Sequence, residues 1–206
     1  ARSKAVAVSP VACGGLCGWG VATSGIAPVA LALSSEGTVM VTDGTSRIPA
    51  GDLYLDDGIN DLTKWPDEIG IALHLPPTKL RMTSAYWKLR RLPAFDFPIL
   101  GVAVALNWDA GVVTEARGAL GAVGSHPVDI TPSLQPLVGQ RPDENLVAEL
   151  AQASDKRSRP LDNTDLDHYW RKRMTKVYVE RALRDACGFE PLGGRLSAHL
   201  KQSASA

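Results

Sequence analysis

Alternating or continuous apolar runs along the chain predict five β-strands. They span residues 38–42, 68–75, 84–90, 99–108 and 112–120. Only Asp109-Ala-Gly111 separates the last two, and so short a loop predicts an antiparallel hairpin. The stretch from Arg47 to Gly58 breaks the pattern with Pro, Gly and Asp, and is predicted to be a surface loop.

Helical spacing of apolar residues predicts three helices. Residues 24–33 form a short buried helix with Ser24 as N-cap and a proline in the first turn. Residues 143–152 begin with acidic side chains, which the helix dipole favours. The third helix runs through residues 166–183, and Gly188 is its natural stop.

Together these elements predict an α+β protein. An incomplete α/β subdomain occupies residues 1–78, and an antiparallel three-stranded sheet packed with helices occupies residues 79–190. Residues 191–206 are small and polar, and are predicted to form a flexible tail.

Composition excludes several classes of function. Lys+Arg and Asp+Glu are both 22, so no net charge attracts the chain to nucleic acid. No apolar run reaches the length of a membrane span. Three cysteines do not make a disulfide framework, which favours a reducing, cytoplasmic location. The first residue is Ala rather than Met, so the chain is either processed or a piece of a longer one.

The residues alone indicate no catalytic set and no metal site. Cys13 and Cys17 lie in a Gly-rich loop and the third cysteine, Cys187, is far away, whereas zinc or iron–sulfur sites want about four ligands. Gly14 and Gly15 could let backbone amides approach a phosphate, but glycine clusters are usually turns.

Charged residues in the predicted elements have structural interpretations. Lys88 lies next to Trp87 on a strand, either as a solvated edge lysine or as a cation near a flavin ring. The paired carboxylates, Asp56-Asp57 and the group Asp162, Asp165 and Asp167, fit loop and capping roles. The basic run 171–173 on the last helix is predicted to be a solvated face.

Six segments, in order, are similar to motifs of the FAD-binding middle subunits of the xanthine dehydrogenase and carbon monoxide dehydrogenase group, the molybdenum hydroxylases. They are Ser24–Leu33, Arg47–Gly58, Pro66–Pro76, Tyr86–Pro98, Val102–Leu106 and Pro160–Met174. The last of them most resembles the β subunit of the 4-hydroxybenzoyl-CoA reductase branch. The resemblance covers about Ala5 to Gly188.

The resemblance implies an electron-transfer subunit that holds FAD, with residues 1–78 as a partial FAD-binding α/β subdomain. By position, Lys88 matches a lysine near the flavin ring, and Ile69 matches an apolar residue that packs on it. Ser24 and Gly25 match the loop that approaches the ribityl chain. The implied partners are a molybdopterin-binding large subunit and a 2Fe-2S small subunit, and substrate chemistry belongs to the large subunit.

The chain also departs from the family pattern. The N-terminal lobe with its pyrophosphate loop is absent, and Ile26 stands where an aspartate is usual. Asp129 replaces a usual arginine. Gly14-Gly15 could be an altered second FAD loop, or residues 5–17 could align with the cluster-bearing insertion of the reductase branch.

Two hypotheses follow. The first is a flavoprotein-type subunit of a molybdenum-containing oxidoreductase, truncated and binding FAD weakly or not at all by itself. The second is a non-catalytic structural or assembly subunit. Its aromatic anchors would be Trp108, Tyr169, Trp170 and Tyr178.

Overall fold

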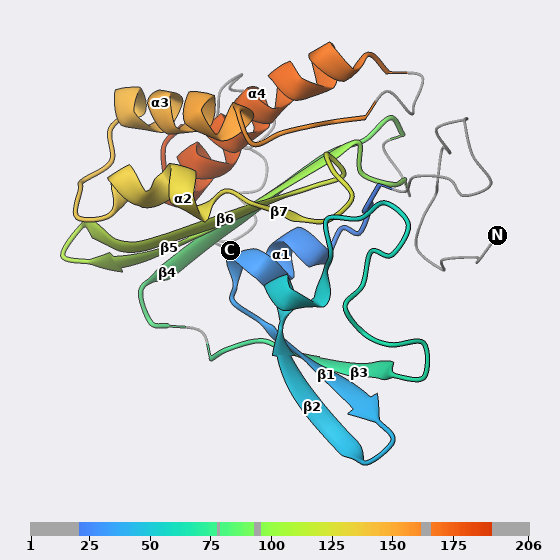
Figure 1. The fold of residues 1–206 in the computed structure, drawn as a ribbon. Helices are drawn as coiled ribbons and strands as arrows, with labels where there is room; N and C mark the ends of the chain where they lie inside the picture. The colour runs from blue at the N-terminus through green and yellow to red at the C-terminus, as the bar shows by residue number, and fades with distance from the viewer. Residues whose placement is uncertain (1–20, 78, 93–95, 162–165, 191–206) are drawn as a thin grey trace.

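The computed structural model describes residues 21–77, 79–92, 96–161 and 166–190, and its strands form two antiparallel sheets (Figure 1). The smaller sheet has the order β2-β1-β3, and the larger has the order β4-β5-β6-β7. The strands are β1 (Glu36–Val41), β2 (Gly44–Pro49), β3 (Ile69–His74), β4 (Met82–Leu89), β5 (Leu100–Asp109), β6 (Val112–Gly121) and β7 (Val128–Asp129). The helices are α1 (Ala27–Ala32), α2 (Thr131–Leu134), α3 (Glu144–Asp155) and α4 (His168–Cys187), with short 3-10 turns at Ala50–Leu53 and Gln135–Leu137.

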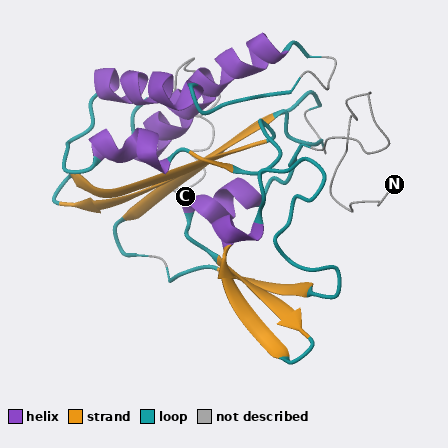
Figure 2. Cartoon of the chain, viewed as in Figure 1, coloured by secondary structure: helices purple, strands orange, loops and turns teal. Residues whose placement is uncertain are grey.

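The β5–β6 hairpin is the centre of the larger sheet. Its turn places Ala110 at φ 47° and Gly111 at φ 79°, the two left-handed positions that a tight hairpin turn requires. One face of β5 carries Leu100, Val102, Val104 and Leu106, all buried. These side chains form the core with α2, α3 and α4, which lie together on that face of the sheet (Figure 2). The predicted antiparallel hairpin is confirmed.

The two long helices are predicted correctly in type and place, although α3 ends three residues later than expected and α4 begins two residues later. The Asp143 side chain accepts a hydrogen bond from the Leu146 amide at the start of α3, at 2.7 Å. Asp167 accepts one from the Trp170 amide at the start of α4, also at 2.7 Å. Gly188 ends α4 in the left-handed conformation, at φ 76°. The capping role of Asp167 is thus confirmed, whereas Asp162 and Asp165 lie outside the described residues.

The opposite face of the larger sheet is lined with small residues, and α1 packs onto it. A methyl group added at Gly121 would lie 2.6 Å from Pro28 Cγ, so the helix fits only because glycine stands there. Neighbouring Gly101 faces Tyr86 and Pro28 in the same way. This close approach positions the segment that leads into α1.

The smaller sheet corrects one prediction. Residues 47–58 were expected to be a loop, but Gly44–Pro49 is strand β2 and the loop begins only after it. The tight turn at Thr42-Asp43 brings β2 back along β1, and Arg47 Nη1 reaches Glu36 Oε2 at 3.3 Å across the pair. Backbone pairing therefore outweighs the turn-like composition of this stretch.

The α+β class is confirmed, with one refinement. The larger sheet has a fourth strand, the two-residue β7, where three strands were expected. Residues 1–20, including Cys13, Gly14, Gly15 and Cys17, lie outside the described residues, as does the tail 191–206. In the part of the chain that the structure describes, no helix is long and apolar enough to cross a membrane.

Candidate functional site

Lys88 lies near the end of β4, and its ammonium group contacts the loop between β4 and β5. Its Nζ donates to the main-chain carbonyl of Asp96. The Asp96 carboxylate in turn accepts hydrogen bonds from the amides of Arg91 and Leu92, each at 3.0 Å, and of Phe97 at 2.8 Å. These bonds, that from Leu92 above all, lower the pKa of Asp96. Lys88 is therefore a positioned cation rather than a freely moving edge lysine.

Ser24 and Gly25 form the entry to α1. Ser24 Oγ accepts from the amides of Ile26, at 3.3 Å, and Ala27, at 3.2 Å, the last residue before α1 and its first. The N-cap position itself is Ile26, two residues later than predicted, and it has no side-chain cap. Two main-chain bonds fix Ala22, two residues before Ser24: its amide donates to the Gly124 carbonyl at 3.1 Å, and its carbonyl accepts from the Ala122 amide at 3.0 Å. The Ser24-Gly25 backbone is thus attached to the end of the larger sheet.

Tyr86 lies between Lys88 and the Ser24-Gly25 segment, and it was not among the predicted site residues. It lies two residues before Lys88 on β4, so both side chains point to the same face of the sheet. A methyl group added at Gly25 would lie 3.5 Å from Tyr86 Oη, and one at Gly101, which pairs with Lys88, only 3.1 Å away. Partial burial raises the pKa of Tyr86. The alternation of Tyr86 with Lys88, opposite a glycine, was the signal that could have identified it.

The remaining predicted cofactor residues are not gathered at this point. Ile69 is the first residue of β3, in the smaller sheet, where it pairs with Met40 and is 61% exposed. Gly14 and Gly15 fall outside the described residues. Ile26, which stands where the resembling family has an aspartate, is 69% exposed. The structure therefore brings together Lys88, Tyr86, Ser24 and Gly25, and leaves Ile69 on a separate sheet.

A second polar cluster links the loop after the first 3-10 turn to the loop after β6. Ser125 Oγ donates to Asp56 Oδ1 at 2.5 Å, and His126 Nδ1 lies 3.2 Å from the same oxygen. A catalytic triad needs the imidazole between hydroxyl and carboxylate, whereas here both groups contact one carboxylate oxygen. The hydrogen bond from Ser125, and then the charge of His126, lower the pKa of Asp56. This cluster connects two loops and offers no nucleophile. Neighbouring Asp57 accepts from the Ile59 amide at 2.8 Å, the predicted loop role.

The basic run 171–173 is a solvated helix face only in part, because Arg173 is exposed and Lys172 half-exposed, whereas Arg171 is buried. Arg171 is only 2% exposed, because α4 turns this side chain toward the ends of β5 and β6. Cys187, also on α4, is half-buried, and burial raises the pKa of its thiol to about 11. No cluster of three or more potential metal ligands occurs among the residues that the structure describes.

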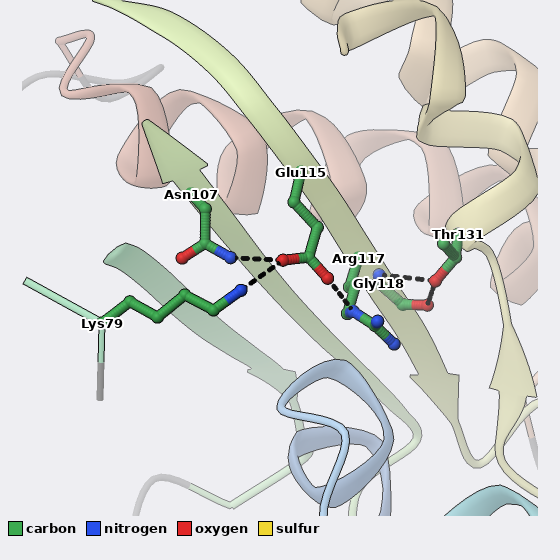
Figure 3. A network of polar contacts seen from close by, with 6 residues as sticks. All are labelled: Lys79, Asn107, Glu115, Arg117, Gly118 and Thr131. Atoms are coloured by element: carbon green, nitrogen blue, oxygen red, sulfur yellow. Dashed lines mark hydrogen bonds and ion pairs between the residues drawn. The ribbon is translucent and has the colours of Figure 1, made fainter. Parts of the chain in front are cut away.

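A third polar cluster lies on the face of the larger sheet that carries Lys88 and Tyr86, at the end of the sheet far from Lys88 (Figure 3). Glu115 Oε2 accepts from Lys79 Nζ at 2.8 Å and from Asn107 Nδ2 at 2.6 Å, while Oε1 accepts from Arg117 Nε at 2.6 Å. Lys79 precedes β4, so the network fixes the start of that strand to β5 and β6. The hydrogen bonds from Lys79 and then Arg117 lower the pKa of Glu115 to about 2.

We predict that Glu115→Gln lowers the free energy of unfolding by about 0.5–1 kcal/mol near neutral pH. A folded-state pKa below the unfolded value means that the Glu115 contribution is present above about pH 4.5 and is lost toward about pH 2. Urea unfolding at several pH values measures this, and the variant should lack that part of the acid sensitivity. Glu36→Gln, which removes an exposed pair with Arg47, is the matched control with little expected effect. Equal acid sensitivity in wild type and Glu115→Gln would contradict the assignment.

Comparison with known proteins agrees with this fold. Residues 84–186, half of the chain, match the family model of the CO dehydrogenase flavoprotein C-terminal domain. The carbon monoxide dehydrogenase of Hydrogenophaga pseudoflava that lacks the Mo-pyranopterin moiety of its cofactor superposes with a TM-score of 0.73 at 22% identity, over 79% of this chain and 55% of that one. Quinoline 2-oxidoreductase from Pseudomonas putida 86 gives a TM-score of 0.72 at 18% identity, over 82% and 57%.

A reconstituted CO dehydrogenase from Oligotropha carboxidovorans gives the same TM-score, 0.72, at 21% identity, over 79% of this chain and 56% of that one. The chain thus spans little more than half the length of the solved chains that it matches. At these identities the likeness shows the shared fold, and the family model rests on the sheet and helices from β4 to α4. The chain therefore belongs to the CO dehydrogenase flavoprotein C-terminal domain family.

Proposed function

We propose that this chain is the FAD-binding, electron-transfer subunit of a molybdenum-containing hydroxylase, or part of that subunit. The observation that carries the proposal is the positioned ammonium of Lys88 on the same strand face as Tyr86, whose hydroxyl lies against Gly25, in the sheet of a flavoprotein family domain. A cation held near a flavin's N1 and C2 carbonyl favours its negatively charged forms. In this proposal the flavin subdomain ends near residue 78, and residues 79–190 form the C-terminal domain.

The described residues fit one part of an FAD molecule. Lys88 would lie near the ring, and the Ser24-Gly25 backbone, which has no side chain at Gly25, would lie along the ribityl chain. Ile69 is exposed and apolar, as a residue that packs on the ring must be, although it lies on the smaller sheet. When bound, FAD accepts electrons from one donor and passes them to another acceptor; the chain's own residues bind and orient it.

The pyrophosphate is the part for which the described residues offer no holder. Gly14 and Gly15, which lie outside the described residues, are the candidates that the sequence offers. Because flavin affinity depends strongly on pyrophosphate contacts, we expect the chain alone to bind FAD weakly or not at all. A second polypeptide segment is then needed to complete the site.

The implied partners are a molybdopterin-binding large subunit and a 2Fe-2S small subunit, which carry those cofactors. The branch that we favour is that of 4-hydroxybenzoyl-CoA reductase, on the resemblance of Pro160–Met174. Co-expression with the neighbouring genes of the source genome, followed by purification of tagged chain, tests the partnership. Recovery with molybdopterin, iron–sulfur and flavin cofactors supports the proposal, and recovery of the chain without these subunits contradicts it.

A second candidate function is a structural or assembly subunit that has lost FAD binding. The exposed Ile26 favours it, because an aspartate there would have supplied a hydrogen bond to the flavin. Trp108 and Tyr178, two of the four aromatic residues predicted as docking anchors, have contacts within the chain. Trp108 Nε1 donates to Thr83 Oγ1 at 2.7 Å, and Tyr178 packs edge-on against Trp87 with ring centroids 6.3 Å apart. A flavin-free assembly with the partner subunits would favour this second function.

A further inference from the structure

The guanidinium of Arg171 lies at the end of the larger sheet, where α4 crosses it. The side chain is 2% exposed, and three main-chain carbonyls accept hydrogen bonds from it. Nη2 donates to Ala122 at 2.7 Å and to Ile99 at 3.3 Å, and Nη1 donates to Leu161 at 3.0 Å. Burial lowers the pKa of Arg171, so keeping this charge inside the protein depends on these acceptors.

One of these carbonyls belongs to the Lys88 side of the candidate site. Ile99 directly precedes β5, and its amide donates to the Leu89 carbonyl at 2.8 Å, next to Lys88. Ile99 also ends the loop whose Asp96 carbonyl accepts from Lys88. A bond from Arg171 to Ile99 therefore fixes the point at which this loop returns to the sheet.

Another carbonyl belongs to the Ser24-Gly25 side. Ala122 directly follows β6 and has a left-handed backbone, at φ 65°, which is unfavourable for a residue with a side chain. Its carbonyl accepts from Arg171, while its amide donates to the Ala22 carbonyl at 3.0 Å. The guanidinium thus holds Ala122 in the orientation in which Ala122 holds the segment that leads to Ser24.

We propose that Arg171 is a positioning residue for the flavin site, joining the Lys88 loop and the Ser24-Gly25 segment through the carbonyls of Ile99 and Ala122. Nη2 donates to both of these carbonyls while Nη1 donates to that of Leu161. The planar fork of arginine, with five donors, matches this spread of acceptors better than the compact ammonium of lysine. The inference rests on the proposed function only for the ligand; the positioning itself is a property of the chain alone.

Arg184 offers a matched control on the same helix. It is also buried, at 6% exposure, and donates to the Glu190 carbonyl at 3.0 Å and to Glu144 at 3.2 Å. Thirteen residues of helix separate it from Arg171, about 20 Å along the axis. Its loss should destabilise the protein to a similar degree without touching Ile99 or Ala122.

The test compares Arg171→Met with Arg184→Met in the full chain, by residue-resolved amide hydrogen exchange. Both variants should lose roughly 5–10 °C in Tm. Only Arg171→Met should accelerate exchange of the Ala22 and Ala122 amides, by about tenfold or more relative to the amides of α3. Unchanged relative exchange at Ala22 and Ala122 would overturn the proposal. Should Arg171→Met fail to fold, Arg171→Lys gives the same comparison, with a smaller acceleration expected at both amides.

A second measurement addresses the ligand. In the complex with the partner subunits, Arg171→Met should weaken FAD binding by about tenfold, and Arg184→Met should leave it unchanged. Equal weakening by both variants would overturn positioning as the cause. If the wild-type complex binds no FAD, the proposed function fails, whereas the amide-exchange result still decides the role of Arg171.

Discussion

Replacing Gly121 by alanine is expected to displace α1 and lower the free energy of unfolding by about 1–3 kcal/mol. The added methyl group would lie 2.6 Å from Pro28 Cγ, on a ring that cannot rotate away, and 3.5 Å from the Ser24 carbonyl. The helix must therefore move off the sheet, and the Ser24-Gly25 segment must move with it. Urea unfolding measures the loss of stability. Amide exchange at Ala30, whose amide donates to Ile26 at 2.9 Å in α1, measures the local loosening.

Two other glycines are controls for this experiment. An alanine at Gly118 would meet Leu134 at 2.9 Å and Ile130 at 3.0 Å, so it should also destabilise the protein, but on the face of the sheet away from α1. An alanine at Gly51 would meet nothing within 4 Å and should change stability by about 0.5 kcal/mol or less. If Gly118→Ala accelerates exchange at Ala30 as much as Gly121→Ala does, close packing of Pro28 on Gly121 does not position α1.

Replacing Lys88 by methionine is expected to weaken FAD binding in the assembled complex by about tenfold, or about 1.4 kcal/mol. The positive charge favours the reduced, more negative flavin, so its removal should also lower the two-electron potential, by about 30 mV for each tenfold difference in affinity between the two redox forms. The methionine keeps most of the apolar stem while removing the bond to the Asp96 carbonyl. Flavin titration and a reference-dye measurement of the potential give the two quantities.

Lys79→Met is the matched control for Lys88→Met. Lys79 is also paired, with Glu115 at 2.8 Å, but it precedes the opposite end of β4. The eight residues of that strand place the two ammonium groups roughly 20 Å or more apart. The control should therefore leave flavin affinity and potential unchanged. A potential that is the same in Lys88→Met and wild type would show that Lys88 does not face the ring.

Period and capping signals were enough to predict β1, β3 to β6, α1, α3 and α4, because in those segments local preference and burial agree. The apolar face of β5 and the caps of α3 and α4 are examples. The four-residue α2 and the two-residue β7 were not predicted. Strand β2 was missed because its residues, with Pro49 at the end, are typical of loops. Its strand conformation comes from pairing with β1, a contact that no local window contains.

The candidate site was harder to predict for a related reason. Lys88, Ser24 and Gly25 came from a family resemblance, whereas Tyr86 and Arg171 emerged only from the fold. Tyr86 matters because Gly25 and Gly101, distant in sequence, leave space around its hydroxyl. Arg171 sits in a basic run that resembles a solvated face, and only the crossing of α4 over the sheet end buries it. The alternation of Tyr86 with Lys88 was a local signal for the tyrosine, whereas the burial of Arg171 depends on a contact that no local window contains.

The central claim is that this chain supplies one half of a flavin site that another polypeptide segment completes. The most direct measurement is the flavin content of the purified chain, alone and in complex with the molybdopterin and 2Fe-2S subunits. We predict little or no flavin on the chain alone and about one FAD per chain in the complex. Stoichiometric flavin on the chain alone, or an assembled complex that contains molybdopterin and iron–sulfur clusters but no flavin, would contradict the claim.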